Sequence, residues 1–242
     1  MINLYSSQIK EHGFTIIANV FTEQEINKIL TELGRVGTES PVFRKTDDLF
    51  AIRQFLKYLP DIKELVFNDR LKQIINDLFG PGYFVAKSIY FDKPPRSNWF
   101  VSYHQDLTIS VKEKADVPGF GSWTVKQGQF AVQPPLKILE DNFTLRIHLD
   151  DTDKDNGALK VIAGSHLKGI FRPETVERSF EKDVFCEVPK GGVMIMKPLL
   201  LHASDRTKNQ ERRRVIHIEF SRTELPYPLE WAEKEEDRCS FP

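Results

Sequence analysis

The chain has 242 residues, enough for one large domain or two small ones, and its 40% hydrophobic content can bury a core. Lys and Arg number 34 against 35 Asp and Glu, so no charge imbalance favours nucleic acid or an anionic membrane surface as a partner. No apolar run approaches ~20 residues, residues 1–13 lack a signal core, and only Cys186 and Cys239 could form a disulfide, so a cytoplasmic location is expected.

The first third of the chain predicts a short strand followed by helices. Residues 14–21 are rich in strand formers, and Thr22 and Glu25 have the spacing of a capping box that opens a helix. The apolar stripe of this helix would be formed by Ile26, Ile29, Leu30 and Leu33. Residues 61–79 predict two short helices or one broken helix, which Gly80-Pro81-Gly82 ends.

After residue 82 the hydrophobic period changes to that of strands. The predicted strands are 83–93, 143–151, 158–164, 191–197 and 213–221. Residues 107–135 predict a long insertion with one or two short strands. Helices followed by strands predict an α+β, mainly β fold: a double-stranded β-helix (a jelly-roll, cupin-like barrel) with N-terminal helices packed on one face. We expect a single domain over 1–242, with a helix-rich support (1–82), a jelly-roll core (83–222) and a peripheral charged tail (223–242).

Two of the predicted strands carry a polar side. In 143–151 and 213–221, apolar residues alternate with a series that includes Thr144, Arg146, His148, Arg213, His217 and Glu219. The polar side could face solvent, as in many antiparallel sheets, or it could line a polar barrel interior that holds a metal and an acid. The strand pattern alone favours a polar side that faces solvent. For Arg213, the metal motif described next favours a position in the interior instead.

The pair His104 and Asp106 forms an H-x-D motif, and His202 and Arg213 follow it in the chain. Residues i and i+2 of a strand project to the same face, so His104 and Asp106 could both bind one ion. Two histidines and a carboxylate suit Fe(II) and leave other coordination positions open, and His202 could supply the third ligand. The guanidinium of Arg213 is a candidate fork for a carboxylate-bearing co-substrate.

The order and spacing of several sequence blocks resemble the phytanoyl-CoA dioxygenase family, a branch of the Fe(II)/2-oxoglutarate-dependent oxygenases. The blocks are EHGFTIIANVFTEQEI, NWFVSYHQD, LDDTDKDNGALKVIAGSH, LLLHAS and RRRVIHIEFS, and they extend over almost the whole chain. The resemblance implies an oxidoreductase that uses Fe(II), 2-oxoglutarate and O2, hydroxylates a small-molecule substrate, and releases succinate and CO2. Related halogenases lack the carboxylate that matches Asp106, so its presence favours hydroxylation.

The resemblance also implies roles for individual residues. His104, Asp106 and His202 match the iron ligands. Arg213 matches the arginine that pairs with the distal carboxylate of 2-oxoglutarate, and Ser204 matches a hydroxyl that helps there.

Further residues are expected around the co-substrate and the substrate. The expected co-substrate pocket includes Gln105, Ile89, Lys93 and Arg146, the last at a position where some relatives carry a tryptophan. Lys87 falls where some relatives place a substrate-contacting side chain. The 107–135 segment, with Trp123, Lys126 and Gln127, is expected to form much of the substrate wall.

Two alternatives remain: a non-catalytic binding protein on the same barrel, and a metal-binding jelly-roll protein that does not use 2-oxoglutarate. The complete triad argues against the first alternative, and the spacing of His202 to Arg213 argues against the second. A structural or solvated role is expected for His148, His166 and His217. Arg212 and Arg214 are expected to contact solvent. The expected partners are a small molecule, with no nucleic acid and no membrane.

Overall fold

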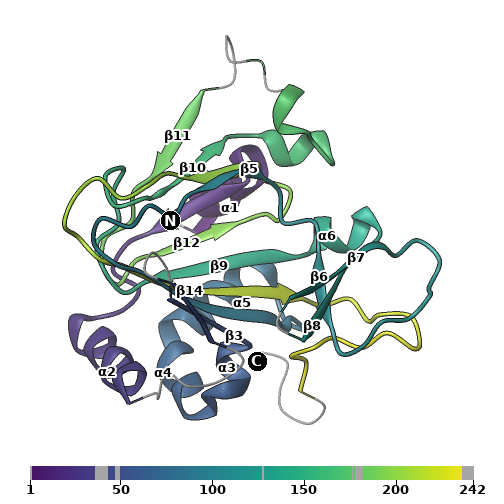
Figure 1. The fold of residues 1–242 in the computed structure, drawn as a ribbon, viewed down its shortest axis with the longest axis horizontal. Helices are drawn as coiled ribbons and strands as arrows, with labels where there is room; N and C mark the ends of the chain where they lie inside the picture. Colours follow the sequence, from purple (N-terminus) through teal and green to yellow (C-terminus); the bar gives the residue numbers. More distant parts are fainter. Residues whose placement is uncertain are drawn as a thin grey trace.

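The computed structural model describes residues 2–35, 43–46, 50–126, 128–175, 177 and 182–235, so Gln127 and Cys239 lie outside the described residues. In the view of Figure 1, α2 (Glu23–Gly34), α3 (Phe55–Tyr58) and α4 (Lys63–Val66) lie at the bottom, a large sheet crosses the middle and a smaller sheet lies above it. Within the described ranges, no helix has the length and apolar character needed to cross a bilayer.

The two main sheets are antiparallel throughout. The larger sheet runs in the order β1 (Phe14–Ile17), β12 (Val193–Met196), β9 (Phe143–His148), β14 (Arg213–Ser221), β4 (Phe84–Lys93), β3 (Phe50–Arg53) and β2 (Phe43–Lys45). The smaller sheet runs in the order β11 (Asp183–Cys186), β10 (Leu159–Ile162), β13 (His202–Ser204) and β5 (Val101–His104). This mainly β, two-sheet arrangement confirms the predicted jelly-roll class.

The helices follow the local signals of the sequence. Thr22 and Glu25 form the predicted capping box at the start of α2 (Glu23–Gly34): the Glu25 amide donates to Thr22 Oγ1 at 3.2 Å, and the Thr22 amide donates to the Glu25 carboxylate at 2.7 Å. The predicted break in 61–79 falls at Phe67 and Asn68, and Asn68 caps the second helix. The other helical segments are α1 (Ile2–His12), α3 (Phe55–Tyr58), α4 (Lys63–Val66), α5 (Asp69–Phe79), α6 (Leu136–Asp141) and the 3-10 turns η1 (Pro60–Ile62), η2 (Ser165–Lys168) and η3 (Pro173–Thr175).

The outer face of the larger sheet packs against the helices and forms the main hydrophobic core. The alternating apolar residues of β9 and β14 reach the apolar stripes of α2 and α5, and the cluster includes Ile26, Leu71, Ile75, Leu145, Ile147, Ile216, Ile218 and Phe220. All of these side chains are fully buried, which stabilises the fold by about 1.5–3 kcal/mol for each one. The helices therefore hold the larger sheet from one side only.

The inner face of the larger sheet is polar and buried at the same time. Thr144, Arg146 and His148 on β9 lie beside Val215, His217 and Glu219 on β14 in the register of the two strands, and all are buried. The prediction that this polar side faces solvent is wrong, because it lies inside the molecule. The alternative interpretation, in which the polar side of these strands lines the interior between the sheets, is the one that the structure shows.

Three parts of the fold depart from the expected division of the chain. Residues 107–135 hold three strands, β6 (Ile109–Val111), β7 (Gly121–Lys126) and β8 (Gln129–Gln133), in a separate sheet. The segment 1–82 adds β1, β2 and β3 to the larger sheet, so it is more than a helical support. The tail is not peripheral at Trp231, which is buried, bridges to Val111, and donates its indole N–H to Thr223 O at 2.9 Å. The boundaries of a single domain stay a prediction.

Candidate metal and co-substrate site

Three potential metal ligands converge where the smaller sheet faces the interior. His104 on β5 and His202 on β13 are cross-strand partners, and their ring centroids lie 4.2 Å apart. Asp106 follows β5 and is held by its amide, which donates to Pro198 O at 2.9 Å. The Asp106 carboxylate oxygens lie 3.8 Å from Nε2 of His104 and 3.8 Å from Nε2 of His202. The structure therefore brings the three sequence-predicted residues together.

Backbone carbonyls fix the tautomer of both imidazoles. Nδ1 of His104 lies 2.9 Å from Ser102 O, and Nδ1 of His202 lies 2.8 Å from Leu200 O. Because a carbonyl oxygen only accepts, each Nδ1 carries the proton and donates, so each neutral ring has its lone pair at Nε2. Metal-binding histidines are held by the same kind of outer hydrogen bond.

The electrostatics of this group suit metal binding. Burial lowers the pKa of His202 to about 4, so its imidazole is neutral near pH 7. Burial alone would raise the pKa of Asp106, but attraction to His202, His217 and Lys87 outweighs it and holds that pKa below its usual range. Oδ2 of Asp106 has no hydrogen-bond partner among the described residues. Two imidazole nitrogens and a carboxylate oxygen thus converge with free electron pairs.

Arg213 brings a buried positive charge into the same interior. It begins β14 opposite Lys93, it is 3% exposed, and its Nε and Nη1 have no hydrogen-bond partner among the described residues. Burial, together with repulsion from Arg146, lowers its pKa to about 9. Ser204 is also buried, on β13 two residues after His202, and its hydroxyl donates a long bond of 3.4 Å to Gly157 O. A buried guanidinium without a counter-charge is costly, so this place favours an anion.

A row of polar side chains crosses the inner face of the larger sheet beside the metal group; we call Arg146, His217, Glu219 and Lys87 the floor network. Nη1 of Arg146 donates to Nδ1 of His217 at 3.0 Å. Nε2 of His217 must then carry the proton, and it donates to the Glu219 carboxylate at 3.1 Å. The same carboxylate accepts from Lys87 Nζ at 2.7 Å. Within the sequence, the only signal for this network was the polar alternation along the two strands.

The floor network also contains a second possible ligand group. Potential ligand atoms of Asp106, His217 and Glu219 lie within 4.8 Å of one another. Both ring nitrogens of His217 and one oxygen of Glu219 are already engaged in the network. The group at His104, Asp106 and His202 is the better candidate because its Nε2 atoms are free to bind.

Gln105 lies between two candidate ligands in the sequence, but its side chain forms hydrogen bonds with the backbone of two loops. Its amide nitrogen donates to Gly169 O at 2.8 Å and to Leu199 O at 2.6 Å, and its amide oxygen accepts from Phe171 N at 2.8 Å. That Gln105 contacts the co-substrate stays a prediction, and these hydrogen bonds do not favour it. Both of its N–H groups are used, and it ties two loops to the end of β5.

The remaining expected residues are divided between the interior and the adjoining sheet. Lys93 is fully buried, and its Nζ donates to Asp205 O at 2.6 Å. Ile89 is buried, opposite His217 in the register. Trp123 on β7 is partly buried and packs on the apolar cluster beneath the three-stranded sheet. Its role in the substrate wall stays a prediction.

The two arginines that flank Arg213 have carboxylate partners. Arg212 makes a two-point ion pair with Asp92, and Arg214 pairs with Asp150 through contacts of 2.6 and 2.8 Å. The prediction that they contact only solvent is wrong. These pairs make Arg213 the one member of the run that is without a carboxylate partner among the described residues.

The other histidines have structural contacts. His148 lies 2.7 Å from Thr152 Oγ1, which confirms a hydrogen-bonded role, and His166 lies 3.2 Å from Lys10 O. His217 is buried in the floor network, so it is not solvated.

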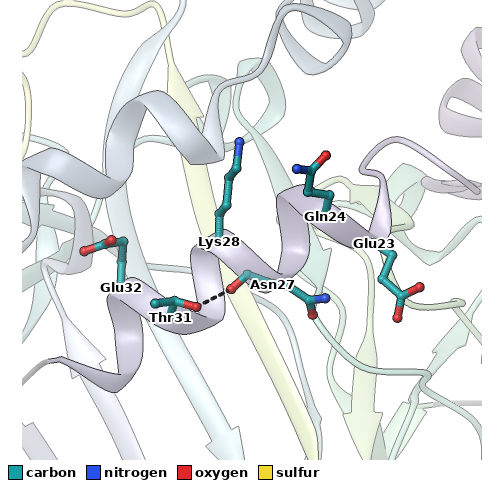
Figure 2. A pocket seen from close by; sticks show the side chains of 6 residues that line it. All are labelled: Glu23, Gln24, Asn27, Lys28, Thr31 and Glu32. Carbon is teal, nitrogen blue, oxygen red and sulfur yellow. Dashed lines mark hydrogen bonds between the residues drawn. The ribbon is translucent and has the colours of Figure 1, made fainter.

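Two hollows on the surface are separate from this group of side chains. One lies over a single helix, and Figure 2 shows that its polar side chains spread from α2 rather than converge on one point. The other lies between α1, α5 and η2 and includes His166 and Lys197. Neither hollow is lined by the candidate metal ligands.

A jelly roll that carries an H-x-D motif and a later histidine on neighbouring strands has the architecture of the Fe(II)- and 2-oxoglutarate-dependent dioxygenases. Residues 9–215 match the family model described as Phytanoyl-CoA dioxygenase (PhyH), and the chain belongs to this family. It is thus a dioxygenase whose cofactor is iron and whose co-substrates are 2-oxoglutarate and O2.

Individual relatives agree with the family. The chain is 24% identical to a probable alpha-ketoglutarate-dependent hypophosphite dioxygenase of Stutzerimonas stutzeri, over 93% of this chain and 81% of that protein. It is 23% identical to the peroxisomal phytanoyl-CoA dioxygenase of Rattus norvegicus, over 90% of this chain and 68% of that protein. Its fold resembles EctD from S. alaskensis in the apoform, with a TM-score of 0.68 and 15% identity over 89% of this chain and 75% of that chain.

Proposed function

We propose that His104, Asp106 and His202 hold the iron, that Arg213 and Ser204 hold the distal carboxylate of 2-oxoglutarate, and that the enzyme hydroxylates a small molecule. One observation carries this proposal. Two imidazole Nε2 atoms face one carboxylate at 3.8 Å, in an interior that also buries a guanidinium with unused donors.

The donor set fits Fe(II). Nitrogen and carboxylate oxygen are the ligands of the two-histidine, one-carboxylate iron centres, which leave the opposite face open. The His202 imidazole is neutral and the Asp106 carboxylate is ionised, which is the protonation state that ligands need. The unsatisfied Oδ2 of Asp106 would gain a partner when a cation binds.

The interior also fits a dicarboxylate. The guanidinium of Arg213 offers donors without partners, and a carboxylate can accept two of them side by side. Ser204 can redirect its long hydrogen bond toward the same anion. Lys93 and Ile89 lie on the same face of β4 and support the proposal as lining residues.

When bound, iron and 2-oxoglutarate supply the activation of O2 and the oxidative decarboxylation that yields succinate, CO2 and an oxidant for the substrate C–H bond. The chain itself positions the reactants. Arg213 fixes the direction of the co-substrate by charge and geometry. Asp106 keeps a carboxylate at the metal, which supports hydroxylation.

The names of the relatives support a small-molecule substrate. One is described as a probable hypophosphite dioxygenase and another as a phytanoyl-CoA dioxygenase. The proposal is tested by incubating the iron-loaded protein with 2-oxoglutarate, O2 and a metabolite library while succinate is measured. We expect one or more compounds to stimulate succinate release and to gain one oxygen atom, and we expect no stimulation with His202→Ala. Stimulation that persists in His202→Ala would overturn the ligand assignment.

A further inference from the structure

The polar interior contains more buried cations than anions. The cationic side chains on the inner face of β4, β9 and β14 are Lys87, Lys93, Arg146 and Arg213. Near them are the carboxylates of Glu219, which is buried, and of Asp106, which is partly buried. Lys87 and Glu219 neutralise each other in an ion pair of 2.7 Å.

Loading the cofactor and the co-substrate does not remove this excess. Fe(II) brings two positive charges and 2-oxoglutarate brings two negative charges, so together they leave the balance unchanged. In the proposed function, on which this inference rests, the distal carboxylate belongs to Arg213. Arg146 then remains as a buried cation with no direct ion pair among the described residues, because Asp106, which attracts it from further away, is assigned to the iron.

Arg146 lies near the metal group, at a different level from Arg213. Its cross-strand partner on β14 is His217. His217 lies four residues along β14 from Arg213, and four residues of a strand span about 13 Å. The guanidinium of Arg146 donates to His217, and potential ligand atoms of His217 and Asp106 lie within 4.8 Å of each other. One imidazole ring therefore separates Arg146 from a proposed iron ligand.

The guanidinium of Arg146 has unused binding capacity. The residue is 7% exposed, and its Nε has no hydrogen-bond partner among the described residues. Its hydrogen-bond partner, Nδ1 of His217, carries no negative charge, and no carboxylate of the described residues forms an ion pair with it. A guanidinium binds planar or tetrahedral oxyanions through several parallel hydrogen bonds.

We infer that the primary substrate is a small oxyanion, either a carboxylate or a phosphorus oxyacid, and that Arg146 holds its charged group beside the metal. Both anions offer oxygen atoms at a spacing that the guanidinium fork can bind. A neutral substrate would leave a buried, desolvated cation without compensation, and a cationic substrate would add repulsion. The floor network fixes the position of Arg146 through His217.

The test uses anaerobic protein loaded with Fe(II) and saturating 2-oxoglutarate. Matched probes are titrated into it: propionate against propionamide, and methylphosphonate against its neutral dimethyl ester. Binding is followed by the change in the weak visible band of the iron–2-oxoglutarate complex and by calorimetry. The variants are Arg146→Gln, Arg146→Lys and, as a control, Arg35→Gln, whose side chain is 70% exposed on the surface.

We expect at least one anion to bind about tenfold or more tightly than its neutral counterpart. Arg146→Gln should abolish that preference while the affinity for 2-oxoglutarate stays within about threefold, Arg146→Lys should restore part of it, and Arg35→Gln should behave like the wild type. The pair that shows the preference identifies the carboxylate or the phosphorus oxyacid as the class.

Two results would overturn the inference. Equal binding of anions and neutral probes to the wild type would refute an anionic substrate, and this comparison does not depend on any variant folding. A loss of about tenfold or more in 2-oxoglutarate affinity in Arg146→Gln, with the anion preference intact, would assign Arg146 to the co-substrate instead. Failure of the proposed function is a separate result: the visible band would then be absent before any probe is added.

Discussion

Replacing Arg213 by alanine removes the proposed anchor of 2-oxoglutarate. The guanidinium is 3% exposed and keeps two donor atoms without partners, so the co-substrate would pair with it away from water. Truncating one partner of a buried charge pair costs about 2–5 kcal/mol. The dissociation constant for 2-oxoglutarate should therefore rise by roughly 30-fold or more in Arg213→Ala. Arg213→Lys should recover part of the affinity, because an ammonium supplies charge without the fork.

The assay is calorimetric titration of 2-oxoglutarate into the Mn(II)-loaded protein, with metal affinity measured separately and expected to stay the same. The chain offers matched controls in Arg212→Ala and Arg214→Ala, since these neighbours pair with Asp92 and Asp150 and leave Arg213 intact. Ser204→Ala should weaken binding by about tenfold or less. Wild-type affinity in Arg213→Ala, combined with weak binding in either control, would refute the reasoning.

Three further changes test other parts of the structure. Gly157 has φ +88°, and a Cβ there would lie 2.6 Å from Lys93 Nζ. Gly157→Ala should therefore weaken 2-oxoglutarate binding and lower the melting temperature. An unchanged calorimetric titration and an unchanged melting curve would contradict this prediction. Burial raises the pKa of Glu233 to about 7, so the stability contributed by its protonated form is present below about pH 4.5 and is lost as pH rises through 7, by up to about 3 kcal/mol. Urea unfolding at pH 5 and pH 8 should show this decline in the wild type and much less of it in Glu233→Gln; equal declines would disprove the effect. Thr22→Ala should cost about 1 kcal/mol in the same assay, and no loss would show that the capping box is dispensable.

The sequence predicted the long elements well, because their hydrophobic periods are set by local residues. The strands at 83–93, 143–151 and 213–221 alternate over many residues, and the capping box at Thr22 is a local signal. Short strands such as β5 and β13 were not predicted, because three or four residues show no period. α1 was also missed, since Ile9 is the one residue it buries fully.

The candidate ligands could be predicted from the H-x-D motif and the family resemblance. The side chains that surround them could not be predicted from the sequence. Alternation on β9 and β14 is the same whether the polar side faces water or a second sheet, and long-range packing decides between the two. Likewise, the partner of Arg214 is Asp150, 64 residues earlier in the chain. Such a pairing depends on the register of the sheet rather than on local sequence.

The most direct test of the central claim is an anaerobic spectroscopic titration with Fe(II), performed with and without 2-oxoglutarate. We expect a weak visible charge-transfer band that requires both components in the wild type. The band should be lost in His104→Ala, Asp106→Ala and His202→Ala, each of which should remain folded by circular dichroism. A wild-type protein that forms no band, or a band and near-wild-type iron binding in any two of these variants, would contradict the proposed site.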